Sequence, residues 1–419
     1  MFAVENAQSL LGVVLILALC WAVSESRARF PWRLALGAVA AQAVLVLILF
    51  SAPAARAALA GAAAAVQGLA GSTQSGVAFV FGFLAGGSGQ PYQVTDPSGL
   101  YILAFRVLPV ILVVCALSSL LWHWRLLRWL TQAFGLLFQR TMGLRGAPAL
   151  AIAATVFMGQ VEGPIFIRGY LAGLTRSELF LLLTVGMSCV AGSTVVAYAT
   201  ILAGAVPHAA EHVLTASLIS APAGVLLARI LVPRDPAAEI ASDYDPGATK
   251  TYASSIDALM KGTHDGLHMV LAIGATLLVF VALIAMVNGL LGMAGPVAGA
   301  PLSVQRGLGI VFSPLAWAMG IPWREAGSAG ALLGAKLVLT EFTAFIDLTR
   351  LGPGVISDRT RVIMTYALCG FANIASVGIN VAGMVPTTAA VRQVARKPPA
   401  IAFHTMAITS SRRSGIRKV

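Results

Sequence analysis

Long apolar runs separated by short charged turns dominate the chain. The clearest runs cover residues 10–23, 34–50, 101–124, 214–231 and 267–291. A helix needs about 20 mostly apolar residues to cross the hydrocarbon core of a bilayer. These runs therefore predict membrane-spanning helices, and the uninterrupted run 267–291 is typical of a scaffold element.

From residue 147 onward the apolar runs are shorter and carry polar or small residues at their centres. One run ends at the sequence GQVEGP (159–164), and the run 179–202 is interrupted by GMSCVAGST (186–194). In the second half, the run 329–339 ends just before Glu341, and a later apolar segment is interrupted at 369–378. This pattern predicts two helical hairpins and two broken helices.

The two interrupted regions are similarly spaced. Glu162 precedes the polar segment 189–193 by 27 to 31 residues, and Glu341 precedes the polar segment 373–376 by 32 to 35 residues. Paired interrupted segments in two halves indicate a transporter with internal repeats and a site near the membrane midplane. Backbone without helical hydrogen bonds is tolerated at that depth only where it is buried or lines a cavity.

Two further segments predict helices outside this scheme. Residues 54–87 are rich in alanine, glycine and polar side chains, which favours an interfacial helix. Residues 126–141 place apolar side chains at helical spacing with charges at both ends, which indicates an amphipathic connecting helix.

The composition agrees with a polytopic α-helical membrane protein. Of 419 residues, 58% are hydrophobic and only 11% are charged, whereas soluble proteins carry about 25% charged residues. The net charge of +12 comes from basic residues between the spans and in the tail, where retention of Lys and Arg on the cytoplasmic side explains them. We therefore expect no nucleic-acid binding. The four cysteines lie in apolar stretches without metal-ligand spacing.

The polar residues of the interrupted segments are the candidate site. Carboxylates and amides at membrane depth usually face a cavity, a partner or a substrate. Gln160, Glu162, Glu341, Asn373 and Ser376 offer both hydrogen-bond donors and acceptors, which suits a neutral solute rich in hydroxyl and amide groups. The two carboxylates would stay protonated, bind a cation or accept hydrogen bonds from the substrate, and the first option links the site to proton coupling.

Structural roles are the alternatives for these residues. Glu162 could pair with Arg168, and Glu341 could pair with Lys336. Gln160 could stabilise its hairpin alone, and the hydroxyl residues Ser188, Ser193 and Thr194 could be small packing residues. His264 and His268 share a helical face as metal ligands would, but the end of a span is the favoured interpretation.

Several motifs in order resemble the concentrative nucleoside transporters, including the bacterial nucleoside permeases. They are FVFG (79–82), FRVLP (105–109), TMG (141–143), GQVEGP (159–164), TRSEL (175–179), EF (341–342) and CGFAN (369–373). The resemblance implies a homotrimer in which each protomer has a scaffold domain and a mobile transport domain. It also implies two re-entrant hairpins, interrupted helices in inverted repeats and an elevator-like motion that imports nucleosides.

The resemblance also implies roles for individual residues. Gln160, Glu162 and Thr194 match positions that contact the nucleobase. Glu341, Asn373 and Ser376 match ribose-binding positions, and Phe371 lines the same pocket.

The candidate coupling-ion positions are Thr155, Met158, Cys189 and Val190. Sodium-coupled members of the family share an Asn at the position of Thr155 and a Ser at the position of Cys189. Sodium prefers hard oxygen ligands, so these differences favour proton coupling over sodium coupling. Val161 and Thr340 also differ from many members, which have Thr and Asn there.

The sequence therefore predicts five regions: N-terminal scaffold spans and interfacial helix (1–145), the first transport half (146–235), a long scaffold span with its loops (236–300), the second transport half (301–390) and a basic tail (391–419). The tail has no run long enough for the family's last span. The predicted function is a proton-coupled nucleoside importer of a bacterial inner membrane, with neither enzymatic activity nor a cofactor. The alternatives are sodium coupling and nucleoside binding without transport.

Overall fold

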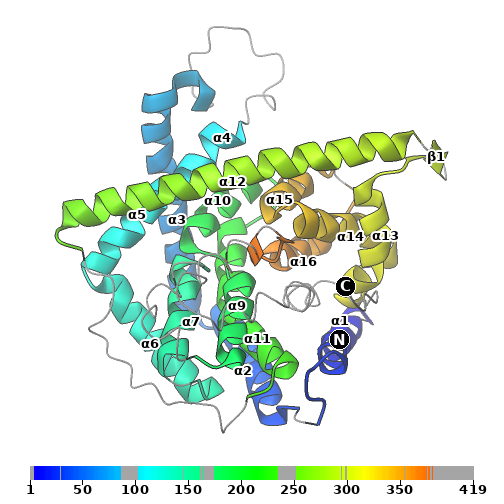
Figure 1. Ribbon diagram of the computed structural model, residues 1–419, viewed down its shortest axis with the longest axis horizontal. Coiled ribbons are helices and arrows are strands. Elements are labelled where there is room, and N and C mark those ends of the chain that lie inside the picture. The colour runs from blue at the N-terminus through cyan, green and yellow to red at the C-terminus, as the bar shows by residue number, and fades with distance from the viewer. Residues whose placement is uncertain are drawn as a thin grey trace.

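The computed structural model is almost entirely helical (Figure 1). It describes residues 4–28, 30–85, 102–144, 146–160, 163, 174–234, 252–293, 295–297, 300–352, 354–374, 376, 377 and 380. The basic tail 391–419 and Glu162 lie outside the described residues. Within the described part, five helices are long and apolar enough to cross a membrane, judged by length and composition. The predicted all-α membrane architecture is confirmed.

The first half begins with three long helices and contains one interrupted helix, formed by α9 and α10, before the continuous helix α11. Its elements are α1 (Val4–Ala22), α2 (Trp32–Ser51), α3 (Pro53–Phe81), the 3-10 turn η1 (Gly82–Ala85), α4 (Leu103–Arg106), α5 (Leu108–His123), α6 (Leu126–Met142), α7 (Gly146–Met158), α9 (Arg176–Ser188), α10 (Gly192–Leu202) and α11 (Ala209–Leu231). The break between α9 and α10 falls inside the predicted interruption 186–194.

The second half contains a helical hairpin, formed by α14 and α15, and an interrupted helix whose first part is α16. Its elements are α12 (Ser255–Gly292), the two-residue strands β1 (Pro296–Val297) and β2 (Ala300–Pro301), α13 (Val304–Ala318), α14 (Trp323–Val338), α15 (Glu341–Arg350) and α16 (Asp358–Leu368). The strands pair antiparallel. The sequence patterns predicted neither the strand pair β1–β2 nor the helix α13.

Four predicted segments differ in extent from the structure. The predicted span 10–23 lies mostly in α1, whose apolar stretch Ala7–Ala22 is shorter than the five candidate spans, and the predicted span 267–291 is part of α12, which begins at Ser255. Residues 54–87 form mainly one continuous helix, α3, which by length and composition is also long enough for a span. The predicted span 101–124 is divided at Val107 into α4 and α5, because Pro109 lacks the backbone N–H that a continuous helix would need there. The amphipathic helix 126–141 is present as α6, with Trp129 exposed and Phe138 buried.

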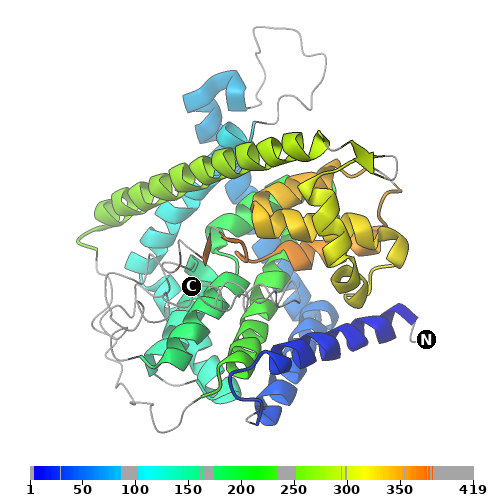
Figure 2. The same cartoon turned by 45° about the vertical axis from the view of Figure 1, so that its right-hand side comes forward.

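The long helix α12 crosses one side of the molecule and packs along α5 (Figures 1 and 2). Leu271, Leu278 and Leu290 on α12 are largely exposed, as expected for side chains that contact lipid. On the same helix, Nδ1 of His268 lies 2.9 Å from the carbonyl oxygen of His264.

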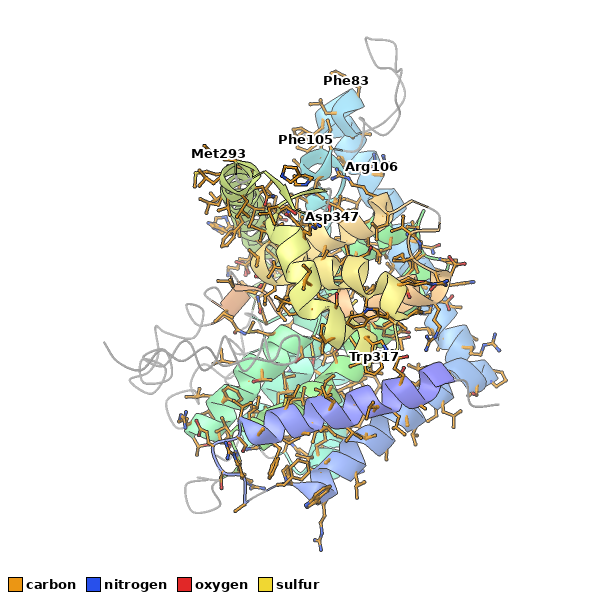
Figure 3. The ribbon with its side chains drawn as sticks, turned by 90° about the vertical axis from the view of Figure 1, so that its right-hand side faces the viewer. Phe83, Phe105, Arg106, Met293, Trp317 and Asp347 are labelled. Carbon is orange, nitrogen blue, oxygen red and sulfur yellow. The ribbon has the colours of Figure 1, made fainter. Side chains whose placement is uncertain are left out.

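The first helix packs against the second half of the chain. Figure 3 places Trp317, near the end of α13, beside α1. The side-chain amide of Gln8 donates to the carbonyl oxygens of Trp317 and Ile321. This contact holds α1 against the repeat that contains the second hairpin.

Two buried apolar clusters surround the broken helices. One gathers side chains of α7, α9 and α11, and the other gathers side chains of α10 and α13 to α16 with residues of α5. The interruptions lie between these clusters, so their polar groups are enclosed by protein.

Candidate functional site

The two interrupted helices meet at their breaks. Cys189 and Cys369 are the first residues after α9 and α16, and both have extended backbone. Gly370 has a φ of 105°, and a Cβ there would lie 2.7 Å from the carbonyl oxygen of Ser188. Only glycine allows both this left-handed conformation and this approach. The sequence predicted the two breaks, and the tertiary structure places them in contact.

The second hairpin brings a carboxylate to this junction. Val338 ends α14, and Thr340 caps α15, its hydroxyl oxygen accepting a hydrogen bond from the backbone N–H of Thr343. Threonine is a favourable capping residue because its oxygen satisfies an N–H group of the first turn. Glu341 therefore begins α15, where the helix dipole favours a negative charge.

Glu341 is enclosed and held by two donors. Its side chain is 3% exposed. Oε1 accepts a hydrogen bond from the hydroxyl of Tyr198 at 2.8 Å, and Oε2 accepts one from Nδ2 of Asn373 at 2.7 Å. Tyr198 belongs to α10 and Asn373 to the second break, so this carboxylate joins both interrupted helices to the hairpin.

Lys336 stands near Glu341 and has partners of its own. Nζ donates to the carbonyl oxygens of Ala367 and Cys369, at 2.9 and 3.4 Å. These carbonyls belong to the C-terminal end of α16, where a positive charge complements the helix dipole. No ion pair joins Lys336 to Glu341 among the described residues. In place of the direct ion pair with Glu341 that was the alternative for Lys336, its ammonium group binds two backbone carbonyls.

The first hairpin brings Gln160 against α9. Gly159 follows α7 with a φ of 121°, and Gln160 is 8% exposed. A Cβ built at Gly186 would lie 3.3 Å from Cβ of Gln160, which places the backbone and Cβ of Gln160 beside the last turns of α9. Glu162, the other predicted residue of this tip, lies outside the described residues.

The remaining predicted substrate residues line the breaks. Thr194 is buried in the first turn of α10, and its hydroxyl donates to the carbonyl of Ala191 at 3.0 Å. Asn373 Oδ1 accepts from the backbone N–H of Ser376 at 2.7 Å, as a helix cap does. Phe371 is half-buried at the second break.

The predicted coupling-ion positions are largely engaged with the protein. The hydroxyl of Thr155 donates to the carbonyl of Ala151 at 2.8 Å. The carbonyl of Val190 accepts from the hydroxyl of Ser217 at 3.1 Å. Cys189 is buried. Met158 is the last residue of α7, and its side chain is outside the described set.

Two buried polar residues of this region, Tyr198 and Asn380, were missing from the sequence prediction. Tyr198 donates to Glu341, and Nδ2 of Asn380 donates to the carbonyl of Leu183 at 3.4 Å. A usable signal for Asn380 exists, because it is an amide seven residues after Asn373 in an apolar segment. Tyr198 stands alone in an apolar run and gave no comparable signal.

Comparison with known families covers most of the chain. Family models described as "Na+ dependent nucleoside transporter N-terminus", "Nucleoside recognition" and "Na+ dependent nucleoside transporter C-terminus" match residues 11–84, 104–205 and 212–403.

Individual relatives agree with these matches. The chain is 37% identical to the uncharacterized transporter YutK of Bacillus subtilis over 90% of this chain and 91% of that protein. It is 32% identical to the nucleoside permease NupC of Helicobacter pylori, over 90% and 88% of the two chains.

Solved structures give the same result for the fold. The transporter CNTnw in an inward-facing substrate-bound state superposes with a TM-score of 0.85 at 33% identity, over 97% of this chain and 96% of that one. The breaks, the two hairpins and these matches along the chain lead to one conclusion: the protein belongs to the concentrative nucleoside transporter family.

Proposed function

We propose that this protein is a proton-coupled symporter that imports nucleosides across a bacterial inner membrane. The observation that carries the proposal is the position of Glu341, a buried carboxylate where the second hairpin meets both broken helices. A carboxylate with an adjacent amide can bind vicinal hydroxyl groups, because it accepts a hydrogen bond from each hydroxyl. Glu341, Asn373 and Ser376 would therefore bind the ribose.

The base would bind at the first hairpin. Gln160 is buried beside α9, and Thr194 follows the break at the start of α10. In this proposal Glu162 and Thr194 contact the base with Gln160, while Phe371 packs against the nucleoside. The relatives named nucleoside permeases support a nucleoside as the substrate.

Proton coupling is proposed over sodium coupling because of the donor set. A sodium site needs several free oxygen ligands, and a thiol such as that of Cys189 is a poor one. The Thr155 hydroxyl donates to the carbonyl of Ala151, and the Val190 carbonyl accepts from the hydroxyl of Ser217. Each oxygen keeps a lone pair that this hydrogen bond does not use, so the thiol of Cys189 is the feature that disfavours sodium. Glu341 is the group that would take up and release the proton, because burial favours the neutral carboxyl while the hydrogen bonds from Tyr198 and Asn373 favour the charged carboxylate.

Uptake into proteoliposomes tests the coupling ion. We expect radiolabelled uridine to accumulate when an inward proton gradient is imposed at constant sodium, and uptake to stop when an uncoupler collapses it. Accumulation that follows a sodium gradient at constant pH would refute proton coupling and support the sodium alternative. Saturable binding without uptake under either gradient would support a nucleoside-binding protein that does not transport.

Glu341→Gln tests the ribose site separately. One carboxylate oxygen becomes an NH2 group, which cannot accept a hydrogen bond. We expect uridine binding to weaken strongly, while any residual binding no longer distinguishes uridine from 2′,3′-dideoxyuridine. Unchanged discrimination would remove Glu341 from the ribose site.

We also propose a homotrimer with an elevator-like transport domain. Light scattering of the protein in detergent should give three times the 43.3 kDa protomer mass after subtraction of the detergent. A monomeric mass that supports full nucleoside binding would contradict the trimer.

A further inference from the structure

Two buried amide side chains flank Gly186 of α9. A Cβ built on Gly186 would lie 3.1 Å from Nδ2 of Asn380 and 3.3 Å from Cβ of Gln160. Gln160 is 8% exposed and Asn380 is 1% exposed. These two residues are 220 positions apart in the sequence, and the absence of a side chain at Gly186 is what lets both approach the same point.

Both amides have an oxygen without a hydrogen-bond partner among the described residues. The oxygens are Oε1 of Gln160 and Oδ1 of Asn380. The hydrogen bond from Nδ2 of Asn380 to the carbonyl of Leu183 fixes which end of that amide faces α9, and the oxygen is the end left over. A buried acceptor without a donor costs free energy, so these two oxygens need N–H or O–H donors, which a bound substrate can supply.

Asn380 also continues the polar face that binds Glu341. Asn373, Ser376 and Asn380 follow one another at intervals of three and four residues, and the described residues from 374 to 380 are helical. Side chains at this spacing lie on the same face of a helix. One end of the face contacts Glu341, and the other end reaches Gly186 beside Gln160.

We propose that Asn380 is a specificity-determining residue that, together with Gln160, binds the exocyclic amino group of the nucleobase. The inference rests on the proposed nucleoside transport and assigns a further residue to the base end of that site. Two amide oxygens require N–H donors, and an exocyclic NH2 group supplies two of them. Cytosine and adenine carry this group, whereas uracil and hypoxanthine have a carbonyl oxygen, an acceptor, at the same position.

Asn380→Leu is the direct test, because leucine has a similar volume and no polar atoms. Binding is measured on the purified full-length protein with two matched pairs, cytidine against uridine and adenosine against inosine. The wild-type protein is expected to prefer cytidine and adenosine. The variant should bind these two about 3- to 10-fold more weakly, the loss expected for one hydrogen bond, and should bind uridine and inosine within about twofold of wild type.

Two further variants separate this role from a structural one. Thr184 is also on α9, and its buried hydroxyl has no partner among the described residues, but it lies about 200° around the helix from Gly186. Thr184→Val should therefore leave the preference within each pair unchanged. Gly186→Ala places a methyl group against Nδ2 of Asn380 and Cβ of Gln160 and should weaken cytidine more than uridine, which tests the site even where Asn380→Leu does not fold.

The outcomes distinguish the two proposals. Equal affinity of the wild type for both members of each pair, or an equal loss for both in Asn380→Leu and Gly186→Ala, overturns the assignment of Asn380 while nucleoside transport stands. A wild-type protein that binds no nucleoside refutes the proposed function and this assignment with it.

Discussion

Replacing Tyr198 by phenylalanine isolates one hydrogen bond of the proposed ribose site. The Tyr198 hydroxyl donates to Glu341 at 2.8 Å, and the residue is fully buried. Its ring packs 5.0 Å from the ring of Phe342 and 4.8 Å from that of Phe345, measured between centroids. Phenylalanine preserves these contacts, so the variant removes only the donor.

The size of the effect follows from the charge of the acceptor. A hydrogen bond to a charged group contributes about 1.5 to 3 kcal/mol to stability. In the variant, Oε1 of Glu341 loses its donor and stays buried, where water cannot take the place of the Tyr198 hydroxyl without a cost in free energy. The free energy of unfolding should fall by about this amount. Glu341 would then be held by Asn373 alone, and we expect nucleoside affinity to fall by about tenfold as the carboxylate loses its fixed orientation.

The measurements are thermal unfolding of the protein in detergent and equilibrium binding of radiolabelled uridine. Tyr252→Phe is the matched control, because Tyr252 is also buried but packs near His123, before α12. The control should keep wild-type uridine affinity. If Tyr198→Phe binds uridine as tightly as wild type, or if the control loses as much, then the Tyr198–Glu341 hydrogen bond does not position the carboxylate.

Two other variants test the junction of the broken helices. Lys336→Met leaves the carbonyls of Ala367 and Cys369 without their donor, which should cost about 1 to 3 kcal/mol for each carbonyl and lower the unfolding temperature. Lys261→Met, on the exposed side of α12, is the control and should leave the unfolding temperature unchanged. Equal unfolding temperatures for the two variants would show that the Lys336 contact is not stabilising. Gly370→Ala puts a side chain into a left-handed conformation, which costs about 1 to 2 kcal/mol, and brings its Cβ against the Ser188 carbonyl. The yield of folded protein and uridine uptake should therefore both be lost. Wild-type yield and uptake would mean that the two breaks do not meet at Gly370.

Much of the architecture could be predicted because it depends on local sequence. Apolar runs long enough to span a bilayer give helices, and small or polar residues at their centres give breaks, since both effects act within a few turns. The run 179–202 and the interruption at 369–378 illustrate this: the structure has breaks at Cys189 and Cys369, inside both predicted ranges. The helix α13 was not predicted because Ser313 and Pro314 interrupt its apolar pattern, although the structure accommodates Pro314 inside the helix.

The sequence also pointed to Glu341 and Asn373 as site residues, because a carboxylate or an amide in an apolar segment is costly without a purpose. Their partners could not be derived in the same way. Tyr198 is 143 positions from Glu341, and Asn380 is 197 positions from the Leu183 carbonyl that it binds. Periodicity reports which face of a helix is apolar and carries no information on which distant helix will pack against it.

The sequence by itself therefore determined the membrane class, the two hairpins, the two breaks and the polar residues of the candidate site. The tertiary structure decided that the breaks lie against each other, that Tyr198 and Asn373 share Glu341, and that Gly186 brings Gln160 and Asn380 together. The physical reason is that helices and breaks are local responses to the apolar solvent. The pairing of buried donors with acceptors, in contrast, depends on long-range packing that only the folded chain specifies.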